Sequence, residues 1–170
     1  QLTLTRTAVT SFHVNKPTWS ALLSSSYSTI DRTQPSAARS LAFANGFALV
    51  YRPVHLLTLE PNVNFKHEWE PGAGLKTDTP SAGFAWAYTP RREMQLVGRA
   101  SFSRSVSEDP VRDSSIVNTT AGLNWKLGKS SFGEQSLSLQ VEYKNESRAA
   151  LADNQHANLT GMIQFKIAGF

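Results

Sequence analysis

The chain contains no cysteine among its 170 residues. This absence excludes a disulfide scaffold and any zinc site built on thiolates. Long hydrophobic runs are also missing, since no segment reaches the roughly 18 consecutive apolar residues that a transmembrane helix needs. Charged residues make up 18% of the sequence against 40% hydrophobic residues, a low share of charge for a soluble domain. The arrangement of the apolar residues therefore carries most of the information.

The sequence also lacks a concentrated charge of one sign. Its 17 basic and 13 acidic residues give a formal net charge of +4. The basic residues are scattered and form no cluster interleaved with aromatic residues, which is the pattern of nucleic-acid-binding surfaces. We predict a solvated basic surface and no nucleic-acid partner. Nothing in the sequence indicates a metal site or a cofactor.

Apolar and polar residues alternate along much of the chain. From Leu57 to Trp69 every second residue is Leu, Leu, Pro, Val, Phe, His or Trp, and the residues between them are mostly polar or charged. This period of two is the signature of a β-strand exposed to two different environments. It recurs in nine segments, which we predict to be strands: 2–14, 19–30, 39–51, 56–70, 81–89, 94–106, 115–127, 136–146 and 157–167.

The connections between these segments alternate in length. The short ones cover residues 15–18, 52–54, 89–93 and 128–134, and the long ones cover 31–39, 70–80, 107–114 and 145–156. The long connections are rich in Pro, Gly, Asp, Asn and Ser, the residues that favour turns. The stretch 35–44 is also compatible with a short helix. Since no linker divides the chain, a single domain is expected.

The apolar faces of these strands have two interpretations. In a soluble β-sandwich or lipocalin-like barrel they form the core, and in a transmembrane β-barrel they face lipid. Three features favour the membrane: strands longer than the usual 5–6 residues, alternating connections, and aromatic residues sorted by strand end. The predicted aromatic girdles consist of Trp19, Tyr51, Tyr88 and Trp125 beside the short turns, and of Tyr27, Phe43, Trp69, Phe102 and Tyr143 near the long connections.

The opposite faces carry the polar and charged residues. On a sandwich they would be solvated, whereas in a barrel they would pair with each other or line a water-filled channel. The predicted lumen-lining residues are Glu60, Asn62, Asn64, Lys66, Glu68, Arg99, Asn124, Lys126, Gln140, Glu142 and Lys144.

The whole pattern resembles bacterial outer-membrane β-barrel proteins. The chain ends in G-M-I-Q-F-K-I-A-G-F, a strand with a terminal aromatic residue, Phe170. In that family this residue is an assembly signal that the barrel-assembly machinery reads. Ala168 is in phase with Phe170, but the apolar set Ile163, Phe165 and Ile167 is one residue out of register, which a bulge near Gly169 would reconcile.

The resemblance implies an all-β, antiparallel, up-and-down transmembrane β-barrel with about eight to ten strands in this chain. It further implies a Gram-negative outer membrane, with the C-terminus on the periplasmic side. The partners would be outer-membrane lipids and the barrel-assembly machinery, and no cofactor is implied.

Nine predicted strands conflict with the even strand number of bacterial single-chain barrels. If residues 1–16 do not span the membrane, an eight-stranded barrel results. Otherwise residues 1–170 are the C-terminal portion of a larger barrel, completed by upstream strands or by a second chain. Because residues 2–14 alternate, we favour the larger barrel.

The polar lumen predicts a pore, or a transport or secretion conduit. The alternative is a small closed barrel with a structural, adhesin or complex-anchoring role. A lipid hydrolase or acyltransferase is less favoured, because neither His13 nor His67 has a local partner that suggests catalysis, and no catalytic residue is predicted. Two carboxylate pairs have only a weak resemblance to calcium sites: Glu68 with Glu70, and Asp109 with Asp113.

Pro61 is the one irregularity within the most regular segment. Proline cannot donate a hydrogen bond to a strand ladder and is usually confined to edges or bulges. In a closed barrel we expect it to mark a bulge or a lapse in pairing.

Overall fold

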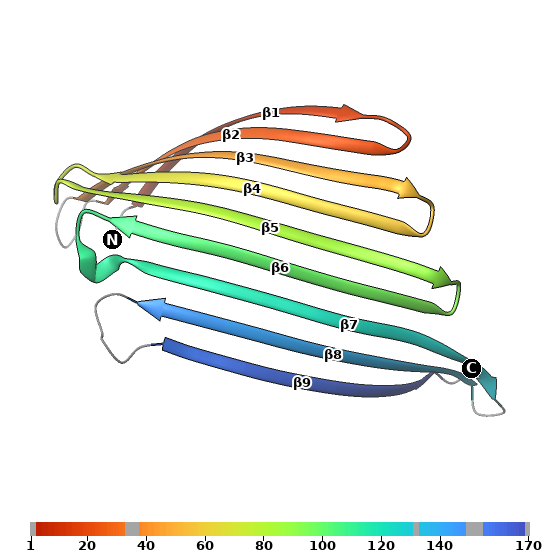
Figure 1. The fold of residues 1–170 in the computed structure, drawn as a ribbon. Helices are drawn as coiled ribbons and strands as arrows, with labels where there is room; N and C mark the ends of the chain where they lie inside the picture. The colour runs from red at the N-terminus through yellow and green to blue at the C-terminus, as the bar shows by residue number, and fades with distance from the viewer. Residues whose placement is uncertain (1–2, 33–37, 131–132, 149–154, 169–170) are drawn as a thin grey trace.

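A computed structural model describes residues 3–32, 38–130, 133–148 and 155–168. They are almost entirely strand, and none lies in a helix long and apolar enough to cross a membrane. The described chain forms nine strands and one short 3-10 helix, η1 (Pro110–Arg112), and Figure 1 labels the strands in chain order. The strands are β1 (Thr3–Asn15), β2 (Trp19–Arg32), β3 (Ala38–Val54), β4 (Leu57–Glu70), β5 (Leu75–Arg91), β6 (Met94–Ser107), β7 (Ser114–Ser130), β8 (Gly133–Arg148) and β9 (Gln155–Ala168).

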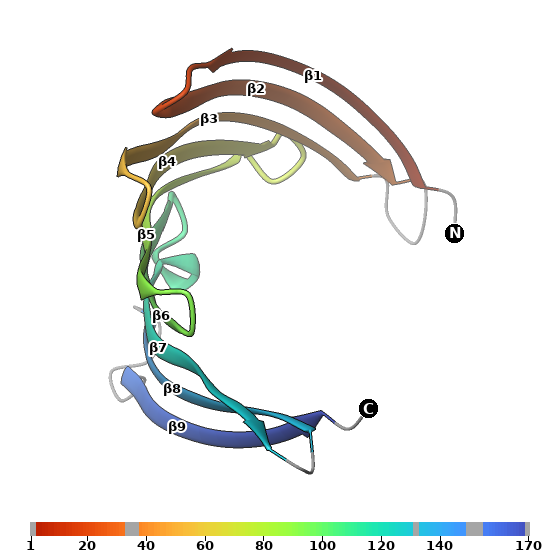
Figure 2. The ribbon, with the colours of Figure 1, turned by 90° about the vertical axis from the view of Figure 1, so that its right-hand side faces the viewer.

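All nine strands belong to one antiparallel sheet, in which each strand pairs with its neighbours in sequence. The prediction of an all-β, up-and-down meander is confirmed. The sheet is strongly curved and open, with β1 at one edge and β9 at the other (Figure 2). The described strands by themselves therefore do not close into a barrel, since β1 and β9 are not paired.

Two of the alternatives drawn from the sequence are wrong. Residues 1–16 do not lie outside the sheet, because β1 pairs with β2 from Thr3 opposite Arg32 to Asn15 opposite Ser20. The eight-stranded alternative is thereby excluded. A helix over 35–44 is also wrong from Ala38 onward, because this stretch begins β3. Its alternating side chains pair with β2 and β4 and satisfy the backbone groups in the ladder.

The predicted connection over residues 70–80 is shorter than expected. β4 continues to Glu70 and β5 begins at Leu75, so that only four residues form the turn. Asp78 pairs with His67, and Lys76 pairs with Trp69. Alternation of apolar and polar residues fades here because both faces of the strand are polar, although the backbone pairing continues. Pattern alone therefore placed the start of β5 too late, at residue 81 instead of Leu75.

The register assigns every side chain of the sheet to one of two faces. Apolar residues share one face, as in the row Leu23, Phe47, Val63 and Ala82, which are successive cross-strand partners. Polar and small residues share the other, as in the row Ser24, Gly46, Asn64 and Ser81. On this second face a hollow of about 390 Å³ extends from β2 to β6, and the side chains of Ser24 and Asn64 converge on Gly46 from both neighbouring strands, which identifies it as the concave side. The apolar face is the convex side.

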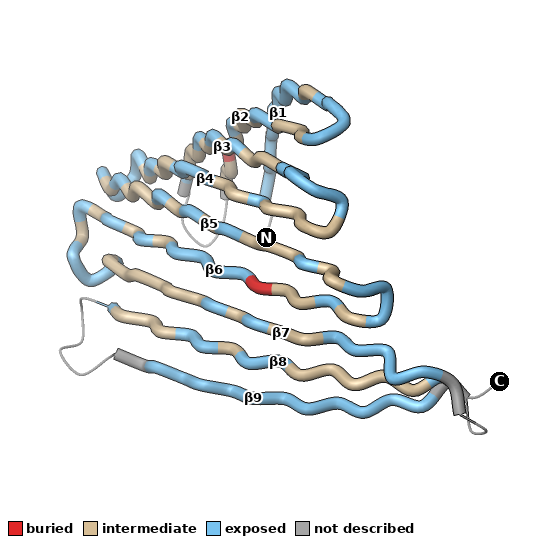
Figure 3. Tube along the Cα trace, turned by 45° about the vertical axis from the view of Figure 1, so that its right-hand side comes forward, coloured by how far each residue is buried: buried red, intermediate tan, exposed pale blue. Residues whose placement is uncertain are grey.

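Large apolar side chains are exposed on the convex face, whereas small side chains on the concave face are half-buried. A soluble domain has the opposite arrangement, with its large apolar side chains buried. Along β3, Phe43 and Phe47 are exposed, whereas Ala44 and Ala48 on the concave side are half-buried. Among the described residues no hydrophobic side chain is buried, and Figure 3 shows intermediate and exposed residues along nearly the whole trace. The described sheet has no hydrophobic core. Burial of apolar area is the dominant favourable term in folding, and the described residues bury little of it within the sheet.

Pro61 interrupts the ladder without a bulge. On the β5 side it lies opposite Phe84. On the β3 side the pairing passes from Ala48–Asn62 directly to Tyr51–Leu59, in an unchanged register. This outcome matches the predicted lapse in pairing, since proline has no N–H to donate. The register shift in this hairpin lies closer to its turn, between Tyr51 and Val54.

Gly98 on the convex face of β6 lies beneath the indole ring of Trp86. The two residues are cross-strand partners, and a β-carbon added at Gly98 would collide with the ring. Covering a strand glycine with an aromatic ring from the neighbouring strand helps to fix the register. The sequence offers no sign of this pairing, because it depends on the length of the β5–β6 turn.

We expect Gly98→Val to lower the free energy of unfolding by about 1–3 kcal/mol, the usual cost of overpacking. Urea unfolding in detergent, followed by tryptophan fluorescence, measures the change. The matched control is Gly161→Val in β9, where an added β-carbon meets nothing within 4 Å. Equal midpoints for the two variants would show that the Trp86 ring moves aside without cost.

Candidate functional site

The structure places all the predicted lumen-lining residues on the concave face. Glu60, Asn62, Asn64, Lys66 and Glu68 alternate along β4 and lie opposite Ala85, Gly83, Ser81, Thr79 and Thr77 of β5. The remaining predicted residues lie in the same face of β6, β7 and β8, and comprise Arg99, Asn124, Lys126, Gln140, Glu142 and Lys144. The sequence therefore identified one continuous polar surface, although it did not indicate which residues are neighbours.

Three of these residues form a central charged row, which consists of Glu60, Arg99 and Glu142. The register passes from Glu60 through Ala85 to Arg99, and from Arg99 through Thr120 to Glu142. Each carboxylate is thus two strands from the guanidinium, a backbone separation of about 10 Å. The small Ala85 and Thr120 leave the space between them open.

The central charged row is free of ion pairs within the described chain, unlike other charges on this face. Lys66 Nζ lies 2.7 Å from Glu68 Oε1, and Lys144 Nζ lies 3.4 Å from Glu146 Oε2. Arg148 also binds Glu146, at 2.8 Å. A cavity of about 310 Å³ adjoins the row and includes Glu60, Ala85 and Arg99 in its lining. The charges of the row are therefore available to water and dissolved ions.

A second hollow of the concave face, about 390 Å³, extends over β2 to β6. The hollow exists because the side chains that line it are small. At Gly46 there is no room for a larger residue, since an added β-carbon would lie 2.5 Å from Asn64 Oδ1 and 2.9 Å from Ser24 Oγ. Lys66 is the charged residue of its lining. Small residues inside and large residues outside also permit the curvature of the sheet. The hollow is an open depression and not an enclosed pocket, and its lining presents hydroxyl and amide groups.

The predicted aromatic residues all lie on the convex face. Near the short turns Trp19 pairs with Tyr51, Tyr88 with Leu57, and Trp125 with Met94. Toward the other end Tyr27 pairs with Phe43, Trp69 with Leu41, and Tyr143 with Thr119. The sorting of these aromatic residues by strand end thus occurs on one face of the sheet.

His67 has a partner that sequence reasoning missed. Its Nδ1 lies 2.6 Å from Asp78 Oδ1, and the two residues are opposite each other on β4 and β5. The pair lies on the convex face, where the next residues in the row are Phe43 and Val106. Neither neighbour is a nucleophile. Asp78 fell within the predicted connection, so no period-two signal pointed to it.

The carboxylates that suggested calcium have other contacts. Asp109 caps η1 by accepting a hydrogen bond from Val111 N at 3.1 Å. Asp113 accepts one from Ser107 N at 2.7 Å. Glu70 binds Arg112 at 3.3 Å, and Glu68 binds Lys66. These contacts order the η1 turn and the adjoining ends of the strands.

The predicted assembly signal, Phe170, and the bulge expected near Gly169 lie outside the described residues. Comparison of the chain with protein-family models, with curated proteins and with solved structures found no match. The functional argument therefore depends on the geometry of the two faces.

Proposed function

We propose that this chain forms part of a bacterial outer-membrane β-barrel, in which the concave polar face lines a water-filled pore and the convex face contacts lipid. The observation that carries this proposal is the reversed distribution of residues: apolar side chains lie on the exposed convex face and polar side chains in the hollow. A protein in water gains stability by the opposite arrangement. Surrounding lipid would stabilise the arrangement seen here.

The strand lengths support the same proposal. A transmembrane β-strand needs about 9–11 residues when it is tilted, and the strands here contain 13 to 17. The aromatic residues near both ends of the convex face correspond to the two membrane interfaces. The His67–Asp78 hydrogen bond and the Arg39–Asp31 ion pair would lie toward the outer surface, beyond the apolar band.

The open edges indicate how the barrel would be completed. In a meander of nine antiparallel strands, β1 and β9 run in the same direction, so direct closure would create a parallel seam. A barrel with only antiparallel pairs requires an odd number of additional strands. The same polypeptide or another chain would supply them, because unpaired backbone groups are not tolerated in lipid.

Single-channel recording in planar bilayers tests the pore. With protein extracted from membranes and purified in detergent, we expect stepwise ion currents. Arg99→Glu makes the central charged row wholly acidic and should shift the permeability ratio several-fold toward cations. Stable insertion without any current would contradict the pore and favour the alternative, a closed barrel with a structural, adhesin or anchoring role.

The barrel itself has a separate test. Folded outer-membrane barrels should migrate differently on a gel before and after boiling, and we expect this heat-modifiable behaviour here. If the protein folds in buffer without detergent or lipid, the membrane proposal is wrong.

A further inference from the structure

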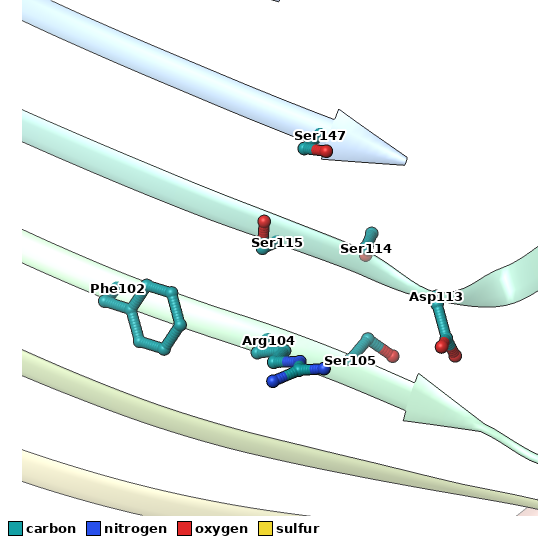
Figure 4. Close-up of a pocket in the computed structure, with 7 residues that line it drawn as sticks. All are labelled: Phe102, Arg104, Ser105, Asp113, Ser114, Ser115 and Ser147. Atoms are coloured by element: carbon teal, nitrogen blue, oxygen red, sulfur yellow. The ribbon is translucent and has the colours of Figure 1, made fainter. Parts of the chain in front are cut away.

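A polar pocket near the η1 end of β6, β7 and β8 includes a row of convex residues in its lining. Its volume is about 340 Å³, and Figure 4 shows the residues around it. The register places Arg104 opposite Ser115, and Ser115 opposite Ser147, in one convex row. Phe102 adjoins the row along β6. The remaining lining residues are Asp113 and the cross-strand pair Ser105 and Ser114, whose side chains the register assigns to the concave face.

Arg104 has no carboxylate partner in the described chain, unlike Arg39 and Lys76 at the same end of the convex face. Arg39 lies 3.5 Å from Asp31, and Lys76 lies 3.9 Å from Glu108. Arg104 makes no ion pair within the described part of the chain, and its side chain is exposed. Arg6 is also unpaired there, but it lies on the edge strand β1, where further strands would add neighbours. Arg104 lies inside the sheet, between β5 and β7.

The groups around Arg104 suit a phosphate. A guanidinium presents a planar fork of N–H donors that matches two phosphate oxygens. The hydroxyls of Ser115 and Ser147 can donate to the remaining oxygens. Asp113 is the one carboxylate of the lining and lies at the loop side (Figure 4), where its Oδ1 is bound by Ser107 N. An anion is therefore favoured on the side toward Phe102.

The position of the pocket indicates the source of the phosphate. Arg104 lies two residues beyond Phe102, a distance of about 7 Å along the strand. Phe102 belongs to the aromatic residues that would mark the membrane interface, so Arg104 would lie at the depth of lipid headgroups. We propose that this pocket binds the phosphate of a membrane lipid headgroup, with Phe102 contacting the apolar part of the lipid. This inference rests on the proposed function.

Binding of short-chain lipids to the detergent-purified protein tests the proposal. The probe is dihexanoyl phosphatidic acid, compared with dihexanoyl phosphatidylcholine and with inorganic phosphate, and bound ligand is counted by native mass spectrometry. We expect phosphatidic acid to bind most tightly, and Arg104→Gln to weaken it by about tenfold. Arg104→Lys should retain part of the affinity, because it keeps the charge but loses the fork.

The matched control is Arg112→Gln, which removes the same charge from an arginine already paired with Glu70 and Asp109. Its affinity should stay within twofold of the wild type. Unchanged affinity in Arg104→Gln would overturn the proposal, as would inorganic phosphate binding as tightly as the lipid. Heat-modifiable migration of each variant verifies folding. A folded, conducting Arg104→Gln variant with unaltered lipid binding would refute this site and leave the pore intact.

Discussion

Val63→Arg is expected to destabilise the protein in lipid by about 2–4 kcal/mol, the cost of an arginine on the lipid face of a barrel near the bilayer midplane. Val63 lies midway along β4 on the convex face, with Phe47 and Ala82 as its cross-strand partners. Its side chain is 52% exposed in the isolated sheet. In water such an exposed position would tolerate arginine. Equilibrium unfolding in lipid vesicles, followed by tryptophan fluorescence, measures the change.

Two controls distinguish lipid contact from a general loss of strand packing. Val54→Arg changes an equally exposed convex valine at the end of β3, where the cost should fall to about 0–1 kcal/mol. Ser101→Arg introduces the same side chain on the concave face of β6, where water would solvate it. If Val63→Arg is no more destabilising than Val54→Arg, the convex face is not in contact with hydrocarbon.

Cysteine labelling should alternate strictly along β4. Residues 1–170 contain no cysteine, so an introduced thiol is the one labelling site within them. In lipid we expect Asn64→Cys and Lys66→Cys to react with a charged, water-soluble thiol reagent at least about 100-fold faster than Val63→Cys and Phe65→Cys. The reason is the cost of moving a charged group into hydrocarbon.

Labelling also separates a water-filled lumen from a filled one. Fast reaction at both concave positions, Asn64 and Lys66, requires continuous water along this part of the face. Slow reaction at all four positions would favour a closed barrel with a packed interior. Fast reaction at all four would mean that both faces meet water, which contradicts a lipid-facing convex surface. Denatured samples give the reference rates.

The alternation of residues was sufficient to predict the strands and their two faces. Each strand shows its faces within its own sequence, because successive side chains point to opposite sides. The approach fails where that contrast disappears, as at Lys76 and Asp78, which belong to β5 and not to the predicted connection. Both faces are polar there, so period two carries no signal even though the backbone remains paired.

The candidate sites required long-range register. Glu60, Arg99 and Glu142 come from three strands, and only the pairing across β5 and β7 brings them into one row. The same holds for Trp86 over Gly98, for His67 with Asp78, and for Arg104 beside Ser115. A shift of one residue in any hairpin would move a whole strand to the opposite face. Turn lengths and cross-strand packing set that register, and neither can be inferred from one strand alone.

Local sequence thus determined that the chain is a meander of long strands with one apolar and one polar face. It did not determine which face is concave, where pairing continues beyond the apolar band, or that the sheet ends in two open edges. Those properties arise from the fit of small residues inside against large residues outside, and from pairing between segments that local alternation does not encode. These properties became known only from the tertiary structure. The same is true of which charged residues of the concave face have no ion-pair partner in the described chain.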